Sequence, residues 1–503
     1  MDLLHNVLFG LSVALSPGNI FSCFLGVIIG TLIGVLPGLG PVTTITLLMP
    51  VTFGLPPETA IIMLAGIFYG AQYGGSTTSI LLNIPGEAAS VVTCLDGYKM
   101  ARQGRAGAAL GISAMGSFIA GTLGLVGLSL LAPPLAGFAL KFGPPEYFAL
   151  ILMGLMMAIY LSEGSVLKGL MMAATGLVLG MVGLDPVHGA ERFTFGLSKL
   201  TDGFDFVVVA MGLFGVTEVL SNVEAPEVRD IFRTSLKGLL PTREDWRRCW
   251  ASVLRGSFLG FFIGILPGGG AIISSFMAYA VEKRVSKHPE QFGQGAIEGV
   301  AAPESANNAA ASSSFIPLLT LGIPGNASIA MIFVALMIHG IRPGPMLLQE
   351  HPDLFWGVVA SMYVGNIILL ALNLPLIGMW VRLLKVPYNF LAVGVLIFCI
   401  IGAYSVNNSA FDVGSVVAFG AAGYLLRKGG FPAAPLVLAM ILGPHLERTL
   451  QQSLIGSGGD PRVFLESPIS ATLLLVTAGL VASPGIRWAW QRYGRGQALK
   501  AAS

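Results

Sequence analysis

Apolar segments long enough to cross a lipid bilayer recur along this chain, separated by short polar or Gly- and Pro-rich stretches. A membrane-spanning helix needs about 20 predominantly apolar residues. A membrane β-barrel would instead show alternating polar and apolar residues in strands of about ten residues, and no such alternation occurs. The pattern therefore predicts an all-α polytopic membrane protein. The first apolar segment starts near Phe21 and has neither a basic head nor a small-residue cleavage site, so we expect a retained helix.

The composition supports this class and excludes others. Of the 503 residues, 54% are hydrophobic and 11% are charged, whereas a soluble domain averages about 25% charged residues. The net charge of +2 gives no reason to expect a nucleic-acid partner. Six His and four Cys leave little material for a metal cluster, and we interpret Cys23, Cys94, Cys249 and Cys399 as small buried thiols.

A glycine ladder occurs twice. GVIIGTLIGVLPGLG (Gly26–Gly40) places Gly at every fourth position and ends in a Leu-Pro-Gly-x-Gly break, and GSFLGFFIGILPGGG (Gly256–Gly270) repeats it rung by rung. Further on, NIPGEAAS (Asn83–Ser90) corresponds to GIPGNAS (Gly322–Ser328). These matches predict two homologous membrane repeats. We divide the chain into a first membrane repeat (1–221), a basic linker (222–255), a second membrane repeat (256–450), and an extra transmembrane helix with a tail (451–503).

The basic linker sets the expected topology. The tail after Ala489 is also basic, and the positive-inside rule puts both in the cytoplasm. We place the near-uncharged N-terminus outside the cell. The first repeat must then cross the membrane an odd number of times to reach the cytoplasmic linker, and the second repeat crosses the same odd number of times. The repeats are then inverted relative to each other, as in many secondary transporters. The linker region holds seven of the 28 Lys and Arg residues, namely Arg229, Arg233, Lys237, Arg243, Arg247, Arg248 and Arg255.

A second basic loop, EKRVSKH (Glu282–His288), bears on this topology. Its side of the membrane depends on whether residues 256–280 cross the bilayer or fold back at Leu266–Gly270. We favour a fold-back or a broken helix at this point. The three cations Lys99, Arg102 and Arg105 are expected to form a solvated cytoplasmic face.

Helix breaks stand at matching places in the two repeats. Proline removes a backbone donor, and glycine leaves a helix easily. Freed backbone groups at membrane depth must be buried in protein or line a watery cavity, and the N-termini of the following helices attract anions. Paired, interrupted segments are the best sequence indication of a transport site. The predicted break residues are Pro37, Pro85, Gly86, Pro267, Pro324 and Gly325.

Polar residues beside the breaks are the candidate ligands. Hydroxyls and amides can donate to a carboxylate and, together with carbonyls, can accept a sodium ion. Back-bonding within a helix is the alternative for each Ser or Thr. The candidates for substrate binding are Thr43, Thr44, Ser76, Thr77, Thr78, Asn83, Ser274, Asn307, Asn308, Ser312, Ser313 and Ser314. The candidates for cation binding are Gly38, Gly40, Gly268, Gly270 and Glu304.

No Lys or Arg lies inside these clusters, so an anionic substrate would be bound by helix ends, neutral donors and a co-bound cation. Glu298 and Glu304 are the acids of the region. An acid near membrane depth is costly and is usually functional, and for both residues a cation ligand and a helix-capping role remain open. The chain lacks the Walker motif and the common hydrolase and zinc motifs. We therefore expect a protein that is not an enzyme and that draws on an ion gradient or a partner.

Four segments resemble the large membrane subunit of the tripartite tricarboxylate transporters, a TctA-like permease. They are GTLIGVLPGLGP, YGGSTTSILLNIPG, PESANNAAASSSFIPLLTLGIPG and the flanking repeat, and the resemblance spans nearly the full length. It implies a bacterial inner-membrane permease of about twelve helices, with a small four-helix membrane subunit and a periplasmic solute-binding protein as partners. It also implies uptake of citrate or related di- and tricarboxylates, driven by sodium or protons. Ser312–Ser314 depart from the Gly and Ala expected in relatives, which bears on substrate choice.

These observations predict a secondary transporter subunit that works by alternating access, with no cofactor other than a possible coupling Na⁺. Two alternatives stay open. One is a passive anion channel, and the other is a membrane subunit for a different organic anion, such as an aromatic carboxylate. A third class, a membrane-embedded enzyme, is supported only by the two acids Glu298 and Glu304.

Overall fold

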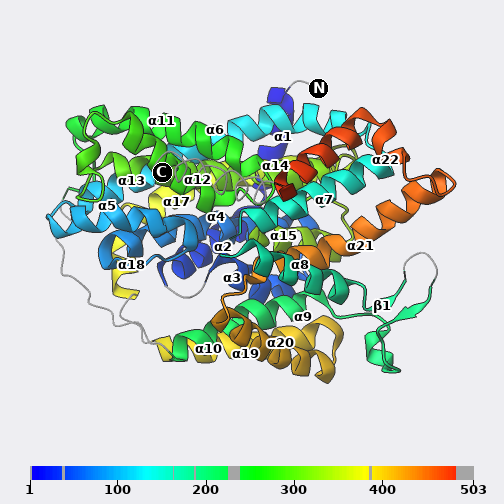
Figure 1. The fold of residues 1–503 in the computed structure, drawn as a ribbon. Coiled ribbons are helices and arrows are strands. Elements are labelled where there is room, and N and C mark those ends of the chain that lie inside the picture. Colours follow the sequence, from blue (N-terminus) through cyan, green and yellow to red (C-terminus); the bar gives the residue numbers. More distant parts are fainter. Residues whose placement is uncertain are drawn as a thin grey trace, which may run out of the picture.

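The computed structural model describes residues 3–36, 40–162, 164–185, 189–224, 238–383 and 388–482, and they are mostly helical (Figure 1). The first half contains α1 (Leu3–Ala14), α2 (Pro17–Val35), α3 (Pro41–Leu48), the 3₁₀ turn η1 (Met49–Thr52), α4 (Pro57–Leu82), the 3₁₀ turn η2 (Ala88–Ser90), α5 (Val91–Arg102), α6 (Ala106–Ala139), α7 (Pro144–Tyr160), α8 (Val166–Gly180), the 3₁₀ turn η3 (Ser198–Leu200), α9 (Phe206–Ala210), the π-helical turn η4 (Met211–Val216) and α10 (Thr217–Glu224). Between α8 and η3, β1 (Gly183–Leu184) and β2 (Glu191–Arg192) pair antiparallel, with Gly183 opposite Arg192.

The second half is built from a similar series of helices. It contains α11 (Arg243–Ile265), α12 (Gly270–Val285), the 3₁₀ turn η5 (Pro289–Gln291), α13 (Glu298–Ser313), α14 (Phe315–Leu321), α15 (Ala327–Ile338), α16 (Leu347–Glu350), α17 (Pro352–Asn373), α18 (Ile377–Leu383), α19 (Tyr388–Asn407), α20 (Ala410–Lys428), α21 (Ala433–Gly456), α22 (Val463–Glu466) and a last apolar helix, Pro468–Ala482.

Within the described ranges, six helices are long and apolar enough to cross a membrane: Pro17–Val35, Ala106–Ala139, Phe206–Glu224, Pro352–Asn373, Phe390–Asn407 and Ala410–Lys428. Other apolar helices are shorter, such as Pro144–Tyr160 and Ala327–Ile338. The mostly helical structure with six candidate spans is what a polytopic membrane protein should show, and the number of about 12 crossings in inverted repeats stays a prediction. Pro468–Ala482 lies in the segment predicted to hold an extra helix. The tail after Ala489 and three of the basic linker residues lie outside the described residues.

Each glycine ladder brings two helices into backbone contact. A Cβ atom added to Gly30 of α2 would lie 2.4 Å from the carbonyl oxygen of Ile67 in α4. In the second half, a Cβ atom added to Gly260 of α11 would lie 2.2 Å from the carbonyl oxygen of Ala306 in α13. The other rungs follow the same register, so α2 runs parallel to α4 and α11 runs parallel to α13. Small residues allow this close approach of helices.

The two ladder units run in opposite directions. Gln72 of α4 lies beside Asn307 of α13, whereas Ser76, one turn later in α4, lies beside Glu304, which comes earlier in α13. Helices α4 and α13 are therefore antiparallel. Each half also packs against the other half. Helix α6 of the first half packs on α13 of the second, and α17 of the second packs on α4 of the first. In the same way, α8 packs on α21, and α20 packs on η4. The largest hydrophobic core accordingly contains residues of both halves.

The chain folds back between α11 and α12. Arg255 of α11 forms an ion pair with Glu282 of α12 (Nη2–Oε1 2.6 Å), and Ser252 donates to the same carboxylate (2.7 Å). These contacts hold the two helices antiparallel around the turn at residues 266–269, as favoured from the sequence. The loop 282–288 therefore lies on the same side as the start of α11.

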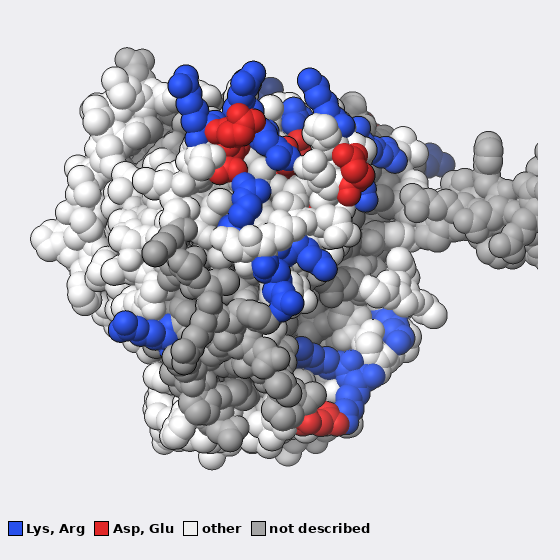
Figure 2. All heavy atoms as spheres, turned by 90° about the vertical axis from the view of Figure 1, so that its left-hand side faces the viewer, with Lys and Arg blue, Asp and Glu red and all other residues white. Residues whose placement is uncertain are grey.

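One end of the molecule is rich in cations. Figure 2 shows Lys and Arg side chains gathered over the left-hand side of Figure 1. The start of α11, the end of α5 and the start of α13 meet there. Arg105 pairs with Asp245 (2.6 Å), and Arg248 pairs with Glu298 (2.8 Å). We call this end the basic face. Glu298 is thus bound by an arginine at the basic face.

Candidate functional site

Glu304 is the most deeply buried acid of the predicted set, with 1% of its surface exposed. Three hydroxyls from three other helices donate to its carboxylate. Ser76 of α4 does so at 2.5 Å and Ser113 of α6 at 3.2 Å, and Thr93 of α5 is the third donor. Within the described residues, no Lys, Arg or His forms an ion pair with this carboxylate. The site is therefore a negative group surrounded by neutral hydroxyl oxygens, at the junction of α4, α5, α6 and α13.

A second acid, Glu87, lies next to this group and follows the first Ile-Pro-Gly break. Its carboxylate accepts a hydrogen bond from the backbone N–H of Ala89 (2.9 Å), so it caps η2. The amide of Asn307 also donates to it (3.3 Å). The Gln72 amide, oriented by its partners, donates to Glu87 (3.1 Å) and to the Asn307 carbonyl oxygen (2.7 Å). Glu87 and Glu304 are close enough to interact electrostatically.

The second pair of breaks forms a separate contact within the other half. The backbone N–H of Gly268 donates to the carbonyl oxygen of Gly325 (2.6 Å), which joins the ladder break to the second Ile-Pro-Gly. Gly268 and Gly270 have positive φ angles, 79° and 48°, which favour glycine. A Cβ atom on Gly270 would lie 3.8 Å from Asn326, the residue whose side chain caps α15 by accepting from Ile329 N–H (3.0 Å).

The first pair of breaks makes a comparable contact. A Cβ atom on Gly86 would lie 2.0 Å from the carbonyl oxygen of Gly34, so only glycine fits where the Ile-Pro-Gly turn meets the ladder helix. Gly40 is the residue before α3, and its carbonyl accepts from Thr44. Pro37 and Gly38 lie outside the described residues.

Many of the predicted hydroxyl ligands bond within their own helices. Thr44, Thr78, Ser274, Ser313 and Ser314 donate to carbonyls three or four residues earlier. This is the back-bonding that the sequence left open as an alternative. Ser312 does the same and also reaches the Gly121 carbonyl (3.4 Å), while Thr43 donates to the Phe214 carbonyl (3.4 Å).

Three other predicted ligands behave differently. Asn308 donates to the hydroxyl of Ser117 in α6 (2.7 Å) and to the Glu304 carbonyl. The Thr77 side chain is buried, with 3% exposed, and has no hydrogen-bond partner among the described residues. Asn83 is exposed and ends α4 with a left-handed φ of 61°. The structure therefore brings Ser76, Glu304, Asn307 and Asn308 together.

Thr93, Ser113 and Glu87 belong to this cluster, although the sequence analysis did not select them. Glu87 carries a usable signal, because it is an acid directly after a predicted break. Thr93 and Ser113 carry none, since each meets Glu304 across more than 190 residues of chain. Their role becomes visible only when α5 and α6 pack against α13.

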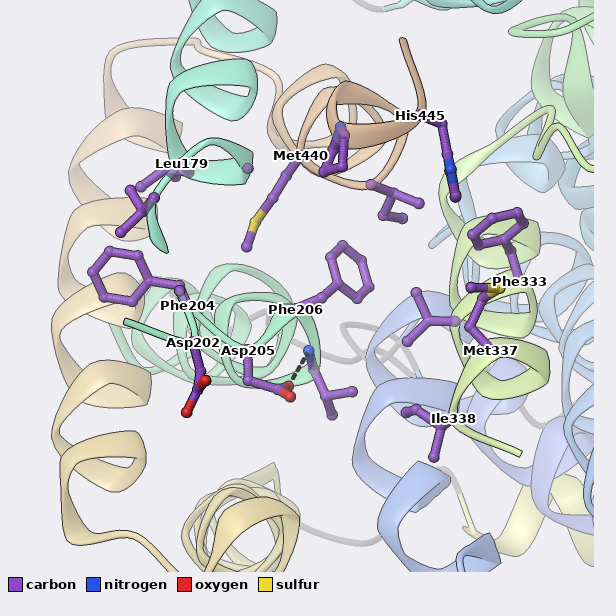
Figure 3. A pocket seen from close by; sticks show the side chains of 17 residues that line it. Leu179, Asp202, Phe204, Asp205, Phe206, Phe333, Met337, Ile338, Met440 and His445 are labelled. Atoms are coloured by element: carbon purple, nitrogen blue, oxygen red, sulfur yellow. Dashed lines mark hydrogen bonds between the residues drawn. The ribbon is translucent and has the colours of Figure 1, made fainter. Parts of the chain in front are cut away.

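A hollow of about 430 Å³ lies elsewhere, between α8, α9, α15 and α21 (Figure 3). Its walls are mostly apolar, and Phe204, Phe206, Phe333 and Met440 are among the side chains that line it. Asp205 at its edge caps α9 by accepting from Val207 N–H (2.8 Å), and burial raises the pKa of this carboxyl. None of the predicted site residues lines this hollow. We therefore base the functional argument on the polar cluster around Glu304.

Paired broken helices with a buried polar cluster between them are typical of membrane transport proteins. The chain matches the tripartite tricarboxylate transporter TctA family over residues 20–438. It belongs to this family, and it is a membrane subunit of a tricarboxylate transporter type.

Two relatives occur in Agrobacterium vitis, and the first of them has a similar length. The chain is 53% identical over 476 residues to a protein described as an uncharacterized 52.8 kDa protein in the TAR-I ttuC′ 3′ region, with 95% of both chains covered. It is 52% identical over 231 residues to an uncharacterized protein in the TAR-II ttuC′ 3′ region, covering 45% of this chain and 96% of that one. No solved structure matches.

Proposed function

We propose that the chain is the large permease subunit of a binding-protein-dependent secondary transporter in the bacterial inner membrane. It takes up di- or tricarboxylates such as citrate together with Na⁺ or H⁺. Its partners are a small four-helix membrane subunit and a periplasmic solute-binding protein. The chain crosses the membrane about 12 times. Its two membrane repeats, residues 1–221 and 256–450, are inverted relative to each other and carry out the transport cycle.

The observation that supports this proposal is the antiparallel arrangement of α4 and α13, each in close contact with its own glycine-ladder helix. Two such units in opposite orientation are the arrangement that many alternating-access transporters use. With α4, α5 and α13 meeting at buried polar groups, movement of one unit relative to the other would expose those groups to each side in turn. The basic face is then cytoplasmic by the positive-inside rule.

The substrate carboxylates bind to neutral donors near the breaks. Asn307 and Thr77 are the best placed, because Asn307 already binds a carboxylate of the protein and the buried Thr77 side chain has no hydrogen-bond partner among the described residues. The absence of a Lys or Arg partner at the Glu304 carboxylate, within the described residues, favours a co-bound cation over a permanent ion pair.

Uptake of labelled citrate into proteoliposomes that contain the chain and both partner subunits tests this function. We expect uptake to follow a Na⁺ or H⁺ gradient, and we expect Asn307→Ala and Thr77→Val to reduce it while the protein still inserts. Wild-type uptake in both variants would remove the substrate-site assignment. Uptake that ignores both gradients would identify a passive channel instead.

A further inference from the structure

We propose that the hydroxyl groups around Glu304 form a binding site for one sodium ion, with ligands from α4, α5, α6 and α13. The site consists of Glu304, Ser76, Thr93 and Ser113, and we call it the Glu304 cage. The inference rests on the proposed function in one respect, because it names the coupling ion and its ligands.

The first step concerns charge. Glu304 is buried and its direct partners are hydroxyls. The other titratable groups that face it are Glu87, Tyr73 and Cys94, and none of them is a cation. An uncompensated carboxylate inside a membrane protein is costly. Some mobile positive charge must therefore accompany the ionised form.

The second step concerns which cation fits. Hydrogen bonds donated to a carboxylate favour its ionised form, and Glu304 receives three of them from hydroxyls. Burial opposes this by favouring the neutral form. A bound metal ion would offset that cost, because it brings its own positive charge and uses the several hydroxyl oxygens that a proton does not need.

The third step concerns the ligands. A hydroxyl has one rotatable hydrogen and two lone pairs, so Ser76, Thr93 and Ser113 can turn their hydrogens away and coordinate a cation through oxygen. Oxygen ligands suit hard cations. A single carboxylate charge matches a monovalent ion. Within the described residues, no group of three or more His, Cys, Asp and Glu side chains that could hold a metal ion occurs, so the cage is not built for a multivalent metal.

An independent observation comes from Ser305. Its hydroxyl is fully buried and has no hydrogen-bond partner. It points at α6, since a Cβ atom on Gly116 would lie 3.1 Å from its oxygen. Gly116 lies one turn after Ser113, whose hydroxyl donates to the Glu304 carboxylate. It also lies next to Ser117, whose hydroxyl donates to the backbone carbonyl of Glu304. A buried unpaired hydroxyl costs about 1–3 kcal/mol, so the residue next to Glu304 keeps a free oxygen on the side of α13 that packs against α6.

The repeat itself shows that these polar residues are not required by the fold. An offset of 239 residues relates Asn83 to Gly322 and Pro85 to Pro324, and it also relates the residues of α4 and α13 that face the ladders, such as Ile67 and Ala306. It places apolar, buried residues opposite two members of the cage. Glu304 and Ser76 correspond to Ala65 and Phe315. The same backbone arrangement therefore packs without polar groups in one copy and carries a cation site in the other.

Binding of ²²Na⁺ to the purified full-length chain in nanodiscs tests the proposal without substrate or partners. We expect saturable binding of one ion, its loss in Glu304→Gln, and an affinity at least about tenfold lower in Ser113→Ala. Ser129→Ala removes another buried α6 hydroxyl far from the cage and should bind like the wild type. Absence of saturable binding in the folded wild type would overturn the proposal.

A second pair of variants covers the case in which Glu304→Gln fails to fold. Thr93→Ser keeps the hydroxyl and should keep binding, whereas Thr93→Val keeps the shape and should lose affinity. Equal affinity in both would overturn the ligand assignment. The two proposals fail separately: without carboxylate uptake the ion would still bind, and without an ion site uptake would continue independently of Na⁺.

Discussion

Asn83 and Gly322 end their helices in the same left-handed conformation, with φ angles of 61° and 70°. Each residue immediately precedes an Ile-Pro-Gly turn, so the two halves stop equivalent helices by the same backbone geometry. Asn and Gly are the residues that adopt this conformation at a helix C-terminus at low cost. The shared conformation gives Asn83 a structural role that is independent of any contact with substrate.

The first prediction separates these roles of Asn83. We expect Asn83→Gly to keep both thermal stability and uptake, because glycine adopts a positive φ freely. Asn83→Val should lower the free energy of unfolding by about 1–3 kcal/mol, because a β-branched residue is strained there. Thermal unfolding in detergent and proteoliposome uptake measure the two effects. Loss of uptake in a stable Asn83→Gly protein would instead support the predicted contact with substrate.

The sequence allowed the ladders, the breaks and the helical membrane class to be predicted, because these features depend on short local motifs. Gly30 and Gly260, for example, belong to runs with glycine at every fourth position, and this spacing alone predicts close helix packing. The local sequence could not indicate their partners Ile67 and Ala306, since chain direction and register are set by tertiary packing.

The same limit applies to the candidate site. Glu304 was found because an acid in an apolar region is conspicuous. Thr93 and Ser113 look like ordinary helical hydroxyls until three helices converge on that acid. Conversely, Ser313 and Ser314 look like ligands in the sequence, yet their hydroxyls bond to carbonyls of their own helix segment.

The second prediction concerns the ladders. Gly30→Ala places a methyl group against the Ile67 carbonyl, and Gly260→Ala places one against the Ala306 carbonyl. Overpacking of this kind costs about 1–3 kcal/mol, so both variants should unfold at lower temperature. Gly137→Ala in α6 is the matched control, because nothing lies within 4 Å of its added Cβ atom. Three equally stable variants would show that the close backbone approach is wrong.

The third prediction tests the fold-back of α11 and α12. Arg255→Glu should destabilise the protein, because it places two carboxylates against each other in a partly buried pair. Glu282→Arg alone should do the same by joining two cations. The double variant with both changes should recover part of the lost melting temperature. If the double variant is as unstable as the sum of the single ones, the two side chains do not meet.

The fourth prediction uses pH. Burial lowers the pKa of His339, and its Nε2 has no hydrogen-bond partner. The unfolded chain therefore binds more protons at this residue below about pH 6.5, so its contribution to stability falls as the pH falls. We expect His339→Gln to lose less melting temperature than the wild type between pH 7.5 and 5.5. His5→Gln, at an exposed site in α1, serves as the control and should match the wild type.

The last prediction concerns a closure at the basic face. The carboxylate of Asp96 in α5 is fully buried and accepts from the backbone N–H groups of Gly293, Gly295 and Ala296, each at 2.8 Å. Tyr279 also donates to it (2.9 Å). These bonds join α5 to the segment before α13, and they lie between the Glu304 cage and the basic face.

In the alternating-access cycle proposed above, passage of a solute to that side would separate α5 from the start of α13 and would break these bonds. Asp96→Asn removes the charge that strengthens them, since hydrogen bonds to charged groups contribute about 1.5–3 kcal/mol each. The variant should therefore populate an open form more often.

Cys94 lies two residues from Asp96 and is half-buried, whereas the other cysteines are buried, so its labelling rate reports on this opening. We expect maleimide to modify Cys94 faster in Asp96→Asn than in the wild type, and at the wild-type rate in Glu290→Gln, an exposed acid near the same face. Equal rates in all three folded proteins would mean that Asp96 does not close this end of the molecule.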